Sequence, residues 1–227
     1  MKNIITIIKK QFRDTVKNKP VLIQFLMFPV MTLIFENAID VDMPELFFVK
    51  MFSCMYVGMA PLVASASIIS EEKEKNTLRV LMMAGVRPFE YLIGIAAYIW
   101  ILCMAGSAVM ATSLPSEDIP FFMTMMGAGS IISIFIGACI GIFAKNQMVS
   151  TSLMMPVMMI LSFSPMLAMF NDKIEKVARF VFTQQLKVTV DGMSFENAGR
   201  FGACVLFANA AVALVLFFMA FRKKGLE

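Results

Sequence analysis

The stretch Ile119–Ala144 reads IPFFMTMMGAGSIISIFIGACIGIFA, 26 residues without Asp, Glu, Lys or Arg. A helix rises about 1.5 Å per residue, so a helix of this length crosses the bilayer's hydrocarbon core of about 30 Å. A segment this long and this free of charge predicts a transmembrane helix.

The composition of the whole chain points the same way. Its 227 residues are 59% hydrophobic and only 16% charged, and the mean hydropathy is +0.78. A soluble domain is roughly half apolar and about a quarter charged. This much apolar surface is stable only in contact with lipid, so the sequence predicts a polytopic membrane protein.

Five further stretches are free of charged residues, which makes six expected spans. The first is short, but Pro20 suits a first helical turn and Glu36 can lie at the headgroups. No internal repeat or soluble domain is evident, so we expect residues 1–227 to form one all-α membrane domain. The spans are expected at about 20–39, 47–70, 91–113, 120–144, 147–170 and 200–221.

The basic residues orient the spans. An even number of spans places both termini on one side, and cytoplasmic loops carry the excess of Lys and Arg. We therefore expect both termini to be cytoplasmic, in a multi-pass protein of the plasma membrane. The terminal side carries 14 of the 20 basic residues: Lys2, Lys9, Lys10, Arg13, Lys17, Lys19, Lys73, Lys75, Arg79, Arg87, Lys145, Arg222, Lys223 and Lys224.

Two segments outside the spans have amphipathic patterns. Residues 1–18 place apolar residues at three- and four-residue spacing beside lysines, which predicts an interfacial helix. Anchoring is the favoured role for it over gating. Residues 172–199 predict an outer amphipathic helix, followed by an alternating run from Leu186 to Val190 and a turn at Asp191-Gly192. For this segment a surface cap is favoured over a substrate-exit lid.

The sequence excludes several kinds of chemistry. It has no histidine, which removes Ser–His nucleophiles and His-ligated zinc, and no CxxC pair, so we expect no metal site. It has no G-x-x-x-x-G-K-[ST] loop for ATP. The spans carry no charge near the bilayer midplane that could couple ions. We expect neither an enzyme nor a nucleic-acid binder, and any energy from ATP must come from a partner.

The most informative segment is the link between the second and third spans, residues 71–89. It follows Ser70, a candidate N-cap, and carries a well-oriented pair in Glu71 and Lys75. After Asn76, Thr77 can cap a short second helix that ends at Gly85 and Pro88. Leu78, Leu81 and Met82 share one face of this helix. By charge pattern alone the link could equally be a solvated hairpin.

The run EKEKNTLRVLMMAGVRPFEYLIG at 72–94 resembles the first cytoplasmic loop of the ABC-2 type permeases, the membrane subunits of one class of ATP-binding-cassette exporters. An interfacial elbow helix, six spans and an outer amphipathic segment also resemble that family. Three places depart from its pattern: Asn76 replaces a glycine, Ile95 a basic residue, and Thr183-Gln184-Gln185 a stretch that commonly contains proline.

The resemblance implies that this loop is a coupling helix, which docks in a groove on a separate ATPase subunit. ATP and magnesium would bind to that partner, and this chain would bind no cofactor. The charged residues would pair with the ATPase while the apolar face fills its groove. The implied coupling residues are Glu71, Glu72, Lys73, Glu74, Lys75, Thr77, Leu78, Leu81, Met82, Gly85 and Arg87.

The resemblance also implies a dimer with a second copy or a related permease, and a cargo path near the dimer seam. Spans without charge favour hydrophobic or amphipathic cargo, with peptides first, in the manner of the small phenol-soluble-modulin-like or bacteriocin-like peptide exporters. Alternatives are export of small hydrophobic drugs, an ATP-independent channel or lipid scramblase, and a structural subunit. Methionine adapts to varied apolar shapes, so the candidate path residues, otherwise read as ordinary packing, are Met55, Met59, Met154, Met155 and Met158.

Overall fold

The protein is described by a computed structural model over residues 2–17, 19–38 and 44–224. Residues 1 and 18 of the expected interfacial helix, and residue 39 of the first expected span, lie outside that range. The described residues form ten helices and no strand. The helices are α1 (Lys2–Lys17), α2 (Lys19–Ala38), α3 (Phe47–Glu74), α4 (Thr77–Met83), α5 (Pro88–Ala111), α6 (Ile119–Phe143), α7 (Gln147–Ala168), α8 (Asp172–Ala178), α9 (Phe182–Asp191) and α10 (Phe195–Lys224).

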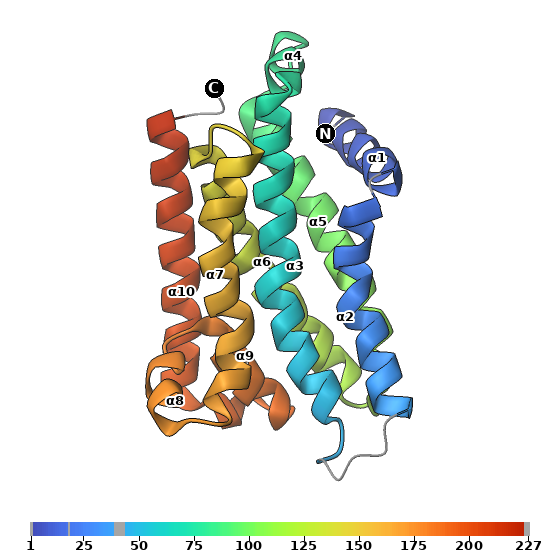
Figure 1. Cartoon of the computed structure of the whole chain (residues 1–227), viewed down its shortest axis with the longest axis vertical. Helices are drawn as coiled ribbons and strands as arrows, with labels where there is room; N and C mark the ends of the chain where they lie inside the picture. The colour runs from blue at the N-terminus through green and yellow to red at the C-terminus, as the bar shows by residue number, and fades with distance from the viewer. Residues whose placement is uncertain (1, 18, 39–43, 225–227) are drawn as a thin grey trace.

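The long helices run lengthwise side by side, as a bundle (Figure 1). Among the described residues, five helices are long and apolar enough to cross a membrane: α3, α5, α6, α7 and α10. The sixth lengthwise helix, α2, has a shorter apolar part, Leu22–Ala38. The chain is therefore an all-α polytopic membrane protein, and its six expected spans overlap these six helices.

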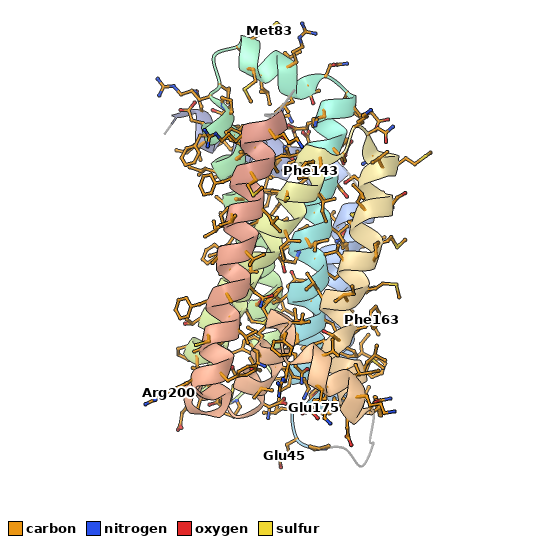
Figure 2. The ribbon with its side chains drawn as sticks, turned by 90° about the vertical axis from the view of Figure 1, so that its left-hand side faces the viewer. Glu45, Met83, Phe143, Phe163, Glu175 and Arg200 are labelled. Atoms are coloured by element: carbon orange, nitrogen blue, oxygen red, sulfur yellow. The ribbon has the colours of Figure 1, made fainter. Side chains whose placement is uncertain are left out.

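The bundle has two distinct ends. The start of α1, the helix α4 and the last turns of α10 lie at one end, which we call the terminal end, and α8 lies at the other, the far end (Figure 1). Figure 2 places Met83 at the tip of the terminal end and Glu45, Glu175 and Arg200 at the far end. The two ends of the described chain thus lie on the same side, as an even number of spans requires.

Helix α3 is the central element of the bundle. Its most apolar stretch is 83% buried within the chain, against 22% for α10. Gly137 and Gly141 let α6 approach α3 closely: a Cβ at Gly141 would lie 2.9 Å from Cβ of Ile69, and one at Gly137 would collide with Leu62 and Ser65. In a membrane, where water does not drive helices together, small residues at an interface permit this contact.

The other side of α3 packs equally closely on α7. A Cβ at Gly58 would lie 2.8 Å from the carbonyl oxygen of Leu161. The hydroxyl of Ser133, on α6, donates to the carbonyl of Val57 at 2.6 Å. α3 is therefore held between α6 and α7 over much of its length.

The expected break at Ser70 does not occur. α3 continues through Ser70 to Glu74, and the Ser70 hydroxyl donates to the carbonyl of Ser67 at 3.1 Å instead of capping a new helix. A serine in a helix can bond back to the preceding turn, which removes the competition that would end the helix. The first part of the coupling segment is therefore an extension of the second span.

The far end differs from the expected surface cap. α8 fits that description, since its N-cap Asn171 accepts from the backbone of Lys173 at 2.9 Å and its Val177 is exposed. α9 instead lies among α3, α6, α7 and α10, and the run Leu186 to Val190 is helical. Seven of its side chains are buried: Phe182, Thr183, Gln184, Gln185, Leu186, Thr189 and Val190.

The contact between α3 and α6 yields a first prediction. Replacing Gly137 with Ala should destabilise the protein by about 1–3 kcal/mol, because the added Cβ would collide with the carbonyl oxygen of Leu62 and must displace the backbone of α3. Thermal unfolding in detergent would measure the loss. Gly127→Ala is the matched control on the same helix, because the atoms nearest its Cβ are side-chain atoms of Met104 and Trp100 at 3.4 Å. Equal melting of both variants would contradict the close-packing account.

Candidate coupling site at the terminal end

The turn between α3 and α4 depends on one residue with an unusual backbone. Asn76 has φ 55° and ψ 12°, a left-handed conformation that glycine and asparagine adopt more readily than other residues. The Thr77 hydroxyl then donates to the carbonyl of Glu72 at 3.1 Å. Asparagine and glycine are interchangeable for this turn, which gives a physical reason for the first departure from the family pattern.

The other end of α4 closes on Gly85, which has φ +86°. The amides of Gly85 and Val86 donate to the carbonyls of Met82 and Leu81 at 3.0 and 3.1 Å. α5 starts next, with the Arg87 amide donating to the Glu90 carboxylate at 3.0 Å. Residues 75–87 thus form a short closed arch between α3 and α5, which we call the arch.

The arch turns a different face outward from the one expected. Leu78 is only 2% exposed, and Leu81 and Met82 are partly buried against the core. These three side chains attach the arch to the bundle, which a seven-residue helix needs because it is too short to be stable alone. Leu78 is therefore not free to fill a partner's groove in this structure, which corrects that part of the sequence prediction.

Three other large apolar side chains are exposed near the arch, two on α4 and one in the first turn of α5. Val80 is 58% exposed, Met83 73% and Phe89 63%, and Met83 lies at the tip of the molecule (Figure 2). We call these three residues the docking ridge. The side chains of Arg79 and Arg87 beside it are also exposed. The ridge therefore combines apolar contact area with positive charge.

The acidic and basic residues at the end of α3 have partners within the chain. The Lys73 ammonium donates to the carbonyl of Ile142 at 2.8 Å. The Glu74 carboxylate accepts from the backbone amide of Gln147 at 2.8 Å. These contacts tie the end of α3 to the link between α6 and α7.

Two further acids in this run are also paired. Glu71 bonds Lys75, one turn later on the chain. Glu72 is 6% exposed and accepts from Lys10 and Gln11 of α1. Glu72 is therefore not accessible to an ATPase in this structure, whereas Glu74 and Lys75 are exposed, and for these residues contact with the ATPase stays a prediction.

The five candidate cargo methionines do not form one surface within the chain. Met55 on α3 and Met154 on α7 are 6% and 8% exposed and belong to the hydrophobic core of the bundle. Met59 and Met158 are partly buried against that core, whereas Met155 is 51% exposed on the outside of α7. Direct cargo contact by Met55 or Met154 would require α3 and α7 to separate.

A comparison with protein-family models matches residues 3–185 of the chain to a family described as ABC-2 family transporter protein. The chain belongs to this family. The match begins at the second residue of α1, includes the arch and ends within α9, so it covers the candidate coupling site completely. No curated protein matches the chain.

Membership of this family shows what kind of protein the chain is. It is a multi-pass membrane permease, a transport subunit and not itself a catalytic one. Among the described residues no group of three or more Cys, Asp or Glu side chains could hold a metal ion. The sequence pattern favours Leu78, Leu81 and Met82 as the docking face, although Val80 and Met83 are three residues apart and so share another face of the same helix.

The turn at Asn76 yields a second prediction. Replacing Asn76 with Gly should leave the stability of the arch unchanged, because both residues accept a positive φ. A β-branched Val at this position should cost about 1–2 kcal/mol, since its Cβ opposes the left-handed conformation. Thermal unfolding of both variants in detergent would measure the difference. Equal stability of the Val variant would show that the turn is not left-handed.

Proposed function

We propose that this chain is the membrane-spanning permease of an exporter that is powered by ATP hydrolysis on a separate subunit. The terminal end faces the cytoplasm of a cell whose plasma membrane holds the bundle, as its excess of Lys and Arg supports. The ATPase docks on the arch, and ATP and magnesium bind to that partner. Membership of the ABC-2 family supports this division of labour.

The docking ridge is the observation that carries the proposal. In Val80, Met83 and Phe89 it offers three large apolar side chains to the aqueous side of the terminal end. Such exposure is costly without a partner, and clustered apolar residues with nearby arginine are typical of interface centres. The flanking Arg79 and Arg87 favour a partner groove that is apolar at its centre and acidic at its rim.

The expected cargo is hydrophobic or amphipathic, with peptides first. The middle parts of the long helices contain no charged side chain, so a highly polar cargo would meet few compensating groups. Met155 is exposed on α7, and Met59 and Met158 are partly buried between α3 and α7. These three are the proposed path residues among the candidates. A dimer with a second copy would complete the path, with outward transport as its direction.

Purification from native membranes in mild detergent tests the proposal as a third prediction. We expect an ATP-binding subunit to copurify, with a native mass that corresponds to two permeases and two ATPases. Mass spectrometry would identify the partner and reveal a second, non-identical permease if one is present. A lone oligomer without ATPase would contradict the proposal and favour an ATP-independent channel or scramblase.

The docking ridge yields a fourth prediction. The double variant V80D/M83D should lose ATPase association at least tenfold, because two charges would enter an apolar groove, while the melting temperature stays unchanged. Val177→Asp is the matched control, since Val177 is 70% exposed but lies on α8 at the far end. Copurification of the ATPase measures association. Retained association in V80D/M83D would place the docking surface elsewhere.

A further inference from the structure

The helix α1 contacts both places where the arch joins the bundle. α1 lies beside the long helices at the terminal end, the end that carries α4 (Figure 1). One attachment is the end of α3, at Glu72, and the other is the start of α5, at Glu90. A single helix therefore reaches both ends of the arch, which carries Val80 and Met83 of the docking ridge.

The attachment at Glu72 is buried and charged. Its oxygen Oε1 forms an ion pair with Lys10 and accepts from the amide of Gln11 at 2.6 Å. A carboxylate that is only 6% exposed is stable only while such partners remain in place. Lys10 also lies 3.6 Å from Asp14, but that acid is exposed. Glu72 is therefore the partner whose loss would release α1 from the arch.

The attachment at Glu90 uses one carboxylate oxygen for two bonds. Oε2 of Glu90 accepts from the side-chain amide of Asn3 at 3.0 Å and from the backbone amide of Arg87 at 3.0 Å. Arg87 is the last residue of the arch. The same atom thus joins the first turn of α1 to the end of the arch.

α1 is itself fixed along α5. Ile7 is 2% exposed and packs on Gly94, where a Cβ would lie 2.8 Å from its Cγ2. The Tyr98 hydroxyl donates to Thr15, and the ring of Phe12 meets the Tyr98 ring edge-on at 5.4 Å. Since α1 is held at several points along α5, it can act as a rigid brace and not as a loose anchor.

We propose that α1 clamps both ends of the arch, so that α1, the arch and the first turns of α5 move as one unit during transport. Glu72 and Glu90 are the positioning residues of this unit. A displacement of the docking ridge by an ATPase then reaches α3 and α5 together instead of bending the arch. This inference rests on the proposed function, and it assigns α1 a coupling role in addition to anchoring.

The fifth prediction is tested on the purified chain without any ATPase. Trypsin needs an extended stretch of chain around the bond that it cuts, so cleavage after Arg79, identified by the masses of the fragments, reports on opening of α4 from the bundle. We expect the Glu72→Gln variant to be cut several-fold faster than the wild-type chain. The Asp14→Asn variant, which lacks the exposed partner of the same lysine, should be cut at the wild-type rate. The charge-reversed pair K10E/E72K should restore slow cutting. Equal rates for Glu72→Gln and wild type would overturn the clamp.

The second test addresses movement as one unit in the ATPase-bound exporter. In a background with Cys54, Cys103, Cys139 and Cys204 replaced by Ala, N3C/E90C loses the bond at Glu90. It should move several-fold less of a dye-labelled amphipathic helical peptide, used as the cargo probe, per ATP hydrolysed. A short cross-linker that reacts with both thiols and is cleaved by reductant should restore the amount of cargo moved per ATP when it joins the two cysteines. Loss of transport on bridging, reversed by reductant, would show that α1 and the arch must separate and would overturn the proposal.

The two tests separate this inference from the proposed function. If the wild-type complex showed no ATP-driven transport, the exporter assignment would fail while the trypsin result on the isolated chain would still report on the clamp. If transport were intact and the cargo moved per ATP were equal in N3C/E90C and its background, the exporter assignment would stand and the coupling role of α1 would be overturned.

Discussion

The bundle depends on the close fit of α3 between α6 and α7. Nearly every side of α3 is in contact with protein instead of lipid, and this is achieved with glycine, alanine and serine at the points of approach. In a bilayer the surrounding lipid is as apolar as the side chains, so association depends on shape and on small residues that admit a neighbouring backbone. The position of α3 in turn fixes the base on which the arch stands.

The charged run at the end of α3 shows how one short sequence serves two purposes. Its acids and bases bond to α1, to the end of α6 and to the start of α7, so they join four helices at the membrane surface. The residues that follow turn an apolar face outward. A firmly bonded base and an exposed apolar tip are thus encoded within about twenty residues.

Much of the fold could be predicted from the sequence, because each span must be long enough to cross the bilayer and must be nearly free of charged residues. The helices α5, α6 and α7 begin and end within a few residues of the apolar stretches. The sequence did not reveal which side chains of the short helix α4 lie inward and which lie outward. The side chain of Leu78 lies inward and that of Met83 outward, which periodicity alone cannot decide, because both sides of a short amphipathic helix carry apolar residues here. Likewise, nothing in the order of charges reveals that Glu72 finds Lys10, 62 positions away.

The buried polar residues of α9 have a consequence for biogenesis. A segment that carries Thr183, Gln184, Gln185 and Thr189 has little tendency to enter lipid alone, since each polar group would lose its hydration. Its surroundings are α3, α6, α7 and α10, three of which are synthesised before it. Insertion of α9 therefore follows the assembly of those three helices, and α10 encloses it last. A chain that is truncated before α10 and released would leave α9 without the helix that encloses it, so its polar side chains would mark an unfinished protein.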